Sequence, residues 1–286
     1  MATRVVSRLR FRMLLTALLS GSATTLGAQA ASDGAAALHT AGLRPLSGDK
    51  SRQKTVCGAP RDTLSDVTRL WESARVILEN SQRNTGEQAS VTFFDRRVAR
   101  DGKVLDAGLD QTRSVSAARP FRSLSPDSVA THGYVIESVD EVSYYAPDAS
   151  VLLSDAFAES HCFGIQSPPS SRPAEIGLSF RPKGERDGVN EIGGTFWFDR
   201  GTLALRQLEF RYTNVPTAYL TARVGGELTF LRVPSGAWTI NAWEIRMPQG
   251  NIESRLLLNN NGKRTQRQVT VQSLRVAGGK VLVKRE

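Results

Sequence analysis

Few residues of this chain have types and spacings suited to chemistry, and two of them are adjacent. His161 and Cys162 end the stretch YYAPDASVLLSDAFAESHCF. A hydrolase with a cysteine nucleophile needs a base that removes the thiol proton. Adjacent side chains on a strand point to opposite faces, and on a helix they lie about 100° apart. The pair is therefore badly placed for proton transfer, and the pattern favours a role in the scaffold.

Other catalytic patterns are weak. Ser47-Gly-Asp-Lys50 fits the letters of an S-x-x-K motif, but that motif needs a rigid helix start, and this stretch lies in an expected linker. His39 lies in the same linker, and His132 lies near the end of an expected short helix. The sequence contains no G-x-S-x-G, no H-E-x-x-H and no phosphate-binding loop. We expect no enzymatic activity and no catalytic residue.

Three acidic residues, Asp148, Asp155 and Glu159, raise the question of a metal site. Their spacing matches no calcium-binding loop, and acidic residues near a helix N-terminus commonly interact with the helix dipole. We therefore expect neither a metal nor a cofactor.

The two cysteines of the chain, Cys57 and Cys162, are enough for one disulfide. An exported protein folds in an oxidising compartment, where such a bridge forms readily. Closing this loop is worth about 4–5 kcal/mol in the chain-entropy model, less any strain. The disulfide is the favoured interpretation. Two reduced thiols and a reactive Cys162 stay open as alternatives.

Residues 1–30 have the features of a signal peptide. Arginines at positions 4, 8, 10 and 12 precede a short apolar run, MLLTALLS, and Ala28-Gln29-Ala30 fits the small-x-small cleavage pattern. The run is shorter than the ~20 apolar residues of a membrane span. We expect cleavage after Ala30 and export to the periplasm or the outer cell envelope.

The charge of the chain bears on its partners. The net charge of +9 falls to +5 when the four arginines of residues 1–30 are removed. The remaining excess forms no long basic run and is not interleaved with aromatic residues as in nucleic-acid-binding modules. We expect no nucleic acid and at most peripheral contact with a membrane surface.

The helical patterns are few. Residues 31–62 are rich in Ala, Gly, Ser and Pro without apolar periodicity, which predicts a flexible linker. Residues 63–79 place Leu64, Val67, Leu70, Trp71 and further apolar residues at helical spacing. Residues 123–133 predict a short capped helix, and residues 149–160 predict one more.

The remaining chain has the period of two that is typical of strands. Turn pairs separate these strands, and in 205–208 the apolar phase slips as a β-bulge at Arg206-Gln207 would produce. The expected turns are Asp101-Gly102, Asp199–Gly201, Pro234-Ser235-Gly236, Asn261-Gly262 and Gly278-Gly279.

Short turns without intervening helices require antiparallel neighbours. The sequence therefore predicts an α+β fold for residues 63–286, as a single domain. We expect a large curved antiparallel β-meander, resembling half of a barrel, with two or three helices packed on one face.

Four blocks carry a resemblance to known proteins: LWESARVIL, YYAPDASVLLSDAFAESHCF, GGTFWFDRGTLALRQLEFRYT and GGELTFLRVPSGAWTINAWEIRMP. Over residues 70–248 the chain resembles bacterial exported proteins labelled as containing a carboxypeptidase-regulatory-like domain. Residues 31–62 are too short to hold that regulatory sandwich, so no link to peptidases follows. The helix-then-meander pattern is also similar, more distantly, to outer-membrane lipoprotein carriers, in which helices plug an apolar concavity.

Two functions follow as alternatives. The first is an exported, non-enzymatic protein that binds an apolar, lipid-like ligand or a peptide on the helix-covered face of the sheet. The second is a structural or protein-interaction module of the envelope, with a filled core and another envelope protein as partner. The ligand-binding candidates are the aromatic residues of the sheet and helices, which alternatively fill the core: Trp71, Phe157, Phe196, Trp197, Phe198, Phe210, Trp238 and Trp243.

Overall fold

A computed structural model of the chain describes residues 64–83, 88–138, 142–233, 236–259 and 262–282, and within them the side chains of all but residues 251–268. The helices are α1 (Leu64–Arg83), α2 (Pro126–His132), α3 (Ala149–Leu152), α4 (Asp155–Ser160) and α5 (Thr217–Thr221). The strands are β1 (Gln88–Ala99), β2 (Val104–Asp106), β3 (Gln111–Ser116), β4 (Val135–Glu137), β5 (Val142–Tyr144), β6 (His161–Gln166), β7 (Glu175–Pro182), β8 (Ile192–Asp199), β9 (Leu205–Tyr212), β10 (Gly225–Arg232), β11 (Trp238–Asn259) and β12 (Gly262–Leu282).

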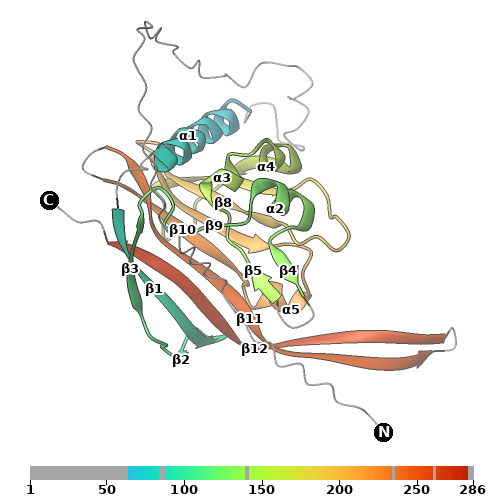
Figure 1. Ribbon diagram of the computed structural model, residues 1–286. Helices are drawn as coiled ribbons and strands as arrows, with labels where there is room; N and C mark the ends of the chain where they lie inside the picture. Colours follow the sequence, from blue (N-terminus) through green and yellow to red (C-terminus); the bar gives the residue numbers. More distant parts are fainter. Residues whose placement is uncertain (1–63, 84–87, 139–141, 234–235, 260–261, 283–286) are drawn as a thin grey trace, which may run out of the picture.

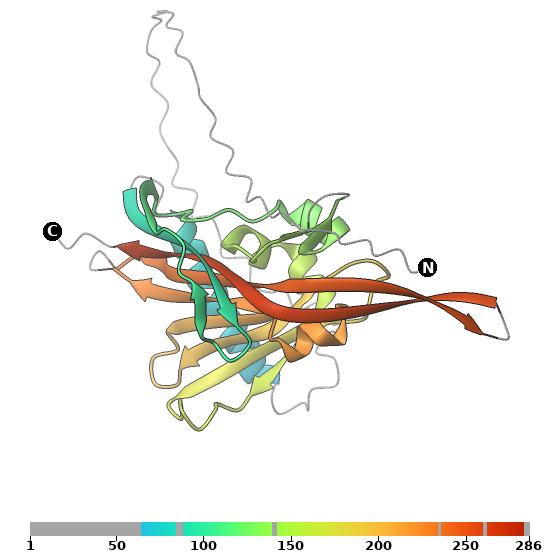
Figure 2. The same ribbon diagram turned by 90° about the horizontal axis from the view of Figure 1, so that it is seen from below.

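One antiparallel sheet organises the described chain. Its strand order is β2-β1-β12-β11-β10-β9-β8-β7-β6, with β3 also paired to β1. Strands β6 to β12 are neighbours in chain order and form a meander, with α5 in the connection from β9 to β10. Strand β1 then pairs with β12, so the first and last strands of the sequence lie side by side. The sheet is open and curved, and the helices α1 to α4 cover one of its faces (Figures 1 and 2). The predicted α+β fold is confirmed.

The main covering helix is α1, which lies over β6, β7, β9 and β11. Its buried positions are Val67, Leu70, Trp71, Ala74, Ile77, Leu78 and Ser81, which recur every three or four residues along one stripe. The Trp71 ring packs 4.8 Å from the ring of Phe163 and 6.3 Å from that of Phe196, centroid to centroid. The apolar stripe of the sequence therefore docks α1 on the sheet.

The short helix α2 agrees with its sequence signals. Ser125 caps it by accepting a hydrogen bond from the Ser128 amide, and Gly133 ends it at a φ of 78°. Leucine or any other L-residue is strained at that φ, so glycine is the natural stop.

The predicted helix over residues 149–160 is in fact two helices. Asp148 caps α3, which ends at Leu152, and Ser154 caps α4 by accepting a hydrogen bond from the Phe157 amide at 3.2 Å. A serine with extended backbone at this point begins a new helix instead of continuing the old one. The prediction of one continuous helix was wrong for this reason.

The predicted turn at Gly278-Gly279 was also wrong, because β12 continues through both glycines. A Cβ added at Gly279 would lie 2.3 Å from the Trp243 indole, and one at Gly278 would lie 2.7 Å from the Phe94 ring. The two glycines make room for an aromatic ring on each face of the sheet, which is a use of glycine unrelated to turns.

Two smaller predictions are confirmed. Trp197 pairs with Gln207 and Phe198 with Leu205, which leaves Arg206 as the extra residue of a bulge. The chain also turns at Asp101-Gly102, where the Gly102 amide donates to the Ala99 carbonyl, and the arm that follows forms β2 and β3, which both pair with β1.

Candidate functional site

The concave face of the sheet, where a lipid-like ligand was expected, is filled by side chains. Most of the largest fully buried residues lie there, each less than 2 % exposed: Phe196, Phe198, Phe210, Tyr212, Leu178, Leu205, Leu208 and Ile192 from the sheet, with Leu70, Leu78 and Leu152 from the helices. Aromatic rings from α1, α4, β6, β7 and β8 pack against one another at this interface. The helices therefore occupy the concavity themselves.

The aromatic residues singled out in the sequence divide into three places. Trp71, Phe157, Phe196, Phe198, Phe210 and Trp243 belong to the packed core of the concave face, although Phe157 also reaches the wall of a cleft. Trp197 points to the opposite face, where the Arg172 guanidinium lies 4.9 Å from its ring centroid. Trp238 lines an open groove beside α1.

His161 serves the scaffold. Its ring stacks on Phe157 at 4.2 Å, Nε2 lies 3.0 Å from the Ile192 carbonyl oxygen, and Nδ1 lies 2.9 Å from both the Phe157 carbonyl oxygen and Ser160 Oγ. Burial lowers the pKa of the imidazole, against a weaker opposing effect of the two carbonyls. These contacts join α4 to β6 and β8.

Cys162 is the next residue of β6 and is also buried, at 4 % exposure. Adjacent strand residues point to opposite faces, so the geometry that disfavoured a His–Cys pair holds on the strand. Cys57 lies outside the described residues, as do the signal peptide at 1–30 and the linker at 31–62, so the disulfide and the export signal stay predictions.

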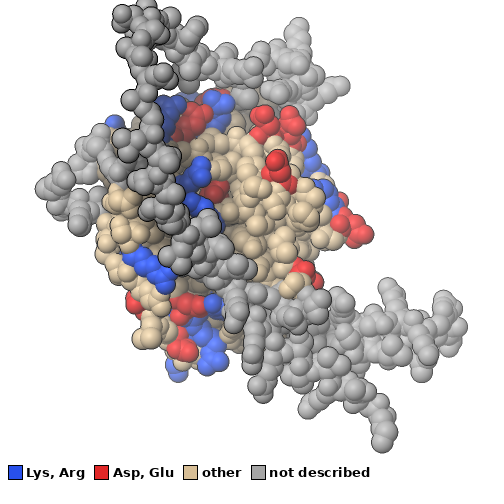
Figure 3. Space-filling view, viewed as in Figure 1, with Lys and Arg blue, Asp and Glu red and all other residues tan. Residues whose placement is uncertain are grey.

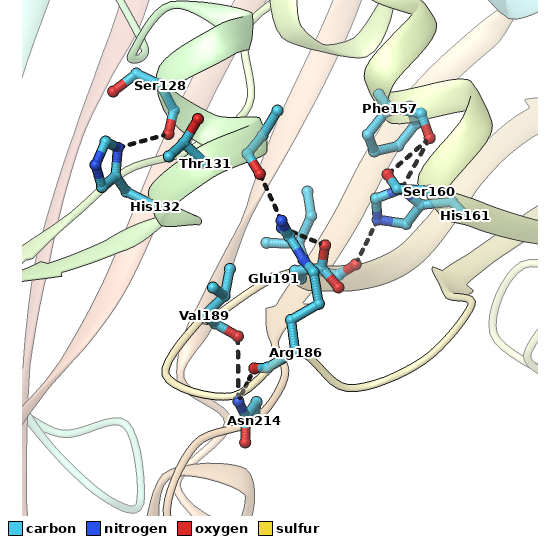
Figure 4. A network of polar contacts seen from close by, with 12 residues as sticks. Ser128, Thr131, His132, Phe157, Ser160, His161, Arg186, Val189, Glu191 and Asn214 are labelled. Atoms are coloured by element: carbon cyan, nitrogen blue, oxygen red, sulfur yellow. Dashed lines mark hydrogen bonds and ion pairs between the residues drawn. The ribbon is translucent and has the colours of Figure 1, made fainter.

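One cleft of about 480 Å³ lies between α2, α4 and the loop that joins β7 to β8. Figure 4 shows the polar network that ties these elements together. Arg186 donates to the Ala130 carbonyl and to Glu191, whose Oε1 lies 2.7 Å from Nη2, and Asn214 Nδ2 donates to the carbonyls of Arg186 and Val189. Arg186 and Glu191 of this cleft thus engage each other, and Arg186 also joins the loop to α2.

A second, larger opening of about 980 Å³ runs along α1, and we call it the α1 groove. One wall is the exposed side of α1 from Arg69 to Asn80, and the other is the β8–β9 turn with the adjoining ends of β10 and β11. Its apolar lining residues are Val76, Ile77, Leu203, Phe230, Leu231 and Trp238, and its charged ones are Arg69, Arg206, Arg232 and Glu72.

The convex face of the sheet is polar. Glu209, Glu227 and Glu244 are directly opposite one another on β9, β10 and β11. Glu209 accepts from Arg172 at 2.7 Å and Glu244 from Arg246 at 2.8 Å, whereas Glu227 accepts from Gln207. Burial, with the two neighbouring carboxylates, raises the pKa of Glu227. Among the described residues no group of His, Cys, Asp and Glu is placed to hold a metal ion.

Charge on the helix-covered side is mixed in sign. Acidic and basic side chains lie mainly toward the margin of the described surface, with uncharged residues between them (Figure 3). No helix in the described part of the chain has the length and apolar character needed to cross a membrane.

Of the groove residues, sequence reasoning singled out only Trp238 as a binding candidate. Val76 falls on the side of α1 away from the apolar stripe, and Leu231 immediately follows the apolar Phe230 on β10. Each is an apolar residue out of phase with the buried face. That mismatch is a signal the sequence contains, but it does not reveal that the two residues line one groove.

Comparisons with known proteins give only distant likenesses. No protein-family model matches the chain, and no curated protein matches its sequence. A DUF1329 family protein from Desulfovibrio piger is similar in structure at a TM-score of 0.33 and 10% identity, over 75% of this chain and 91% of that one. The Pseudomonas aeruginosa MucA/MucB complex is similar at a TM-score of 0.22 and 11% identity, over 75% of this chain and 94% of that one. Both scores are below 0.5, so neither likeness bears on function.

Proposed function

We propose that this chain is an exported, non-enzymatic module of the cell envelope that binds another protein through its surface. The observation that carries the proposal is the filled concave face. The sheet and helices resemble a container in outline, but the side chains of α1, α3 and α4 take the place of a ligand.

The packing supports this function over that of a lipid carrier. A site for an acyl chain needs an apolar cavity of roughly 300 Å³ or more that encloses most of the ligand. The openings beside α1 and between α2 and α4 are instead open to solvent, and each includes charged side chains. Surface openings of this kind suit contact with a protein better than enclosure of a lipid.

The absence of enzymatic activity is part of the proposal. His161 is engaged by two backbone carbonyls and a serine, and its neighbour Cys162 lies on the other side of the strand. The buried Glu191 forms an ion pair with Arg186. These groups hold elements together, which gives them a structural use without a reacting substrate.

Site-specific photo-crosslinking in the native host tests this function. A photoreactive amino acid is placed separately at exposed positions around the molecule: Leu231 and Val76 beside α1, Leu105 on the sheet edge, and Lys183 near α2. We expect a discrete protein adduct from at least one position after irradiation. Adducts with lipids only, or no protein adduct from any position, would contradict the proposed function.

A further inference from the structure

We propose that the α1 groove binds a short extended segment of the partner protein in which apolar side chains are flanked by Asp or Glu. The inference rests on the proposed function and names the surface and the chemistry of the partner. It is carried by three features of the described residues: an exposed apolar floor, a basic rim and an open, elongated shape.

The floor of the groove exposes large apolar side chains. Val76 is 45% and Leu231 is 40% exposed, and both belong to the small set of large apolar residues left open to solvent. Trp238 and Leu203 are half-buried beside them, and Phe230 closes the bottom. Single exposed apolar residues are ordinary, whereas several that converge from separate elements of the fold mark an interaction site.

The rim of the groove is basic. Three arginines line it against a single glutamate. Arg69 is 3.1 Å from Asp66 and Arg206 is 3.2 Å from Asp199, while Glu72 is 3.4 Å from Arg75. Arg232 donates to the Gly236 carbonyl and forms no ion pair with a carboxylate of the described residues. The charge left for a partner is therefore positive, and acidic side chains complement it.

The β-bulge contributes to this rim. Arg206 is the extra residue of β9 at the bulge, and it is exposed among the residues of the groove. A bulge commonly re-aims a side chain that regular pairing would place elsewhere.

The shape of the groove fits an extended peptide. Its wall on α1 runs from Arg69 to Asn80, a length of about 16 Å at 1.5 Å per helical residue. An extended chain covers that length with about five residues. Because the groove is open along one side, it would leave much of an acyl chain in water, whereas a peptide can direct its polar groups outward.

Two other possible occupants of the α1 groove complement its positive charge less well than an acidic segment does. Residues 31–63, which precede α1, contain five basic and three acidic residues, so this segment carries the same sign of charge as the rim. A second copy of the chain is also basic overall, with a net charge of +5 without residues 1–30. A partner segment rich in Asp and Glu meets no such repulsion.

A peptide-binding experiment tests the inference on the full mature protein. The probe is the blocked peptide Asp-Glu-Leu-Phe-Leu-Glu-Asp, compared with one in which lysines replace the acids and one in which Gly-Ser-Gly replaces the apolar centre. Binding is measured by fluorescence anisotropy of labelled peptides. We expect the first peptide to bind at least about tenfold more tightly than either counterpart, and less tightly as salt screens the rim.

Groove variants and matched controls locate the site. Arg232→Glu is expected to weaken binding about three- to tenfold, and Val76→Asp about tenfold. Arg97→Glu and Val104→Asp make the same changes on the β1–β2 edge, where both residues are exposed, and should leave binding unchanged. Circular dichroism of every variant reports whether the fold is intact.

Several results would overturn the inference. These are equal binding of the acidic and lysine peptides, no binding of any peptide, or equal losses in the groove and control variants. Retention on anionic lipid vesicles that Arg232→Glu abolishes would assign the groove to a membrane. A dimer that Val76→Asp dissociates, seen by analytical ultracentrifugation, would assign it to a second copy. Photo-crosslinks to a protein from positions outside the groove would retain the proposed function and reject the groove.

Discussion

The two faces of the sheet differ sharply although they are built from alternate residues of the same strands. On the concave face one cross-strand row runs Leu178, Phe196, Leu208, Leu228, Trp243, Gly279 and Phe93. The residues adjacent to these in each strand form a row on the convex face: Ser179, Thr195, Glu209, Glu227, Glu244, Gly278 and Phe94. The first row is apolar and packed, and the second is largely polar and partly open to water.

Because of this difference, we expect the apolar row to determine the stability of the fold and the polar row to determine how that stability depends on pH. The apolar row is specified by volume, because Trp243 fits only where its neighbour on β12 is a glycine. The polar row is specified by charge: three neighbouring strands each contribute a glutamate, and arginines donate to two of these three. Both rows are occupied by side chains, and for this reason we place the proposed binding surface at the margin where α1 meets the turns.

The largest expected effect comes from truncating the concave row. Phe196→Ala should lower the free energy of unfolding by about 3–5 kcal/mol, because the ring is completely buried and its loss leaves a cavity. Urea denaturation followed by tryptophan fluorescence measures the change. Thr195→Ala, the adjacent residue on the convex face, serves as the control and should change stability by less than about 0.5 kcal/mol. Similar losses for both variants would contradict the asymmetry of the faces.

Overfilling the same row should cost less. Gly279→Ala places a methyl group 2.3 Å from the Trp243 indole, so the ring must move, at a cost of about 1–3 kcal/mol. Gly184→Ala adds the same methyl group where nothing lies within 4 Å. Thermal unfolding should show a clear loss for the first variant and almost none for the second. An unchanged Gly279→Ala protein would disprove the tight fit.

The start of α4 should contribute about 1 kcal/mol. Ser154→Ala removes the hydroxyl that accepts from the Phe157 amide, so that the amide loses its capping partner. The matched control is Ser73→Ala on α1, which removes a hydroxyl that donates only to a carbonyl of its own helix, that of Arg69. In chemical denaturation, the free energy of unfolding of Ser154→Ala should be lower than that of Ser73→Ala. The reverse order would argue against a separate α4.

The smallest effect is expected on the convex row, and it depends on pH. Because the folded-state pKa of Glu227 is raised above its ordinary value, acidification stabilises the fold through this group, and a rise in pH through the same range removes that stability. Glu227→Gln should therefore gain stability over the native protein at neutral pH, on the order of a few tenths of a kcal/mol since solvent screens this partly exposed group.

Unfolding curves at several pH values check this sign. The advantage of Glu227→Gln should shrink as the pH falls to and below the ordinary glutamate pKa of 4.5, because below it the native carboxyl is protonated in both the folded and the unfolded state. An advantage that grows on acidification would mean that Glu227 is stabilised as a carboxylate, in conflict with the crowded row of acids.

Local patterns predicted much of this molecule. The period of two is consistent with Trp197 lying on the face opposite to Phe196 and Phe198, and the phase slip after Leu205 located the bulge. Local patterns failed where a residue is determined by a contact distant in the sequence. Gly279 is such a residue, because it makes room for the Trp243 ring. The α1 groove lay beyond prediction because α1, the β8–β9 turn and β10 meet only in the folded chain.

The most direct test of the account is native mass spectrometry of the protein purified from its own envelope. A closed concave face predicts the mass of the polypeptide without any lipid, whether or not a protein partner is retained. A tightly held lipid-like mass that persists through purification would contradict the account, since it would require α1 to leave the sheet and expose the row that contains Phe196.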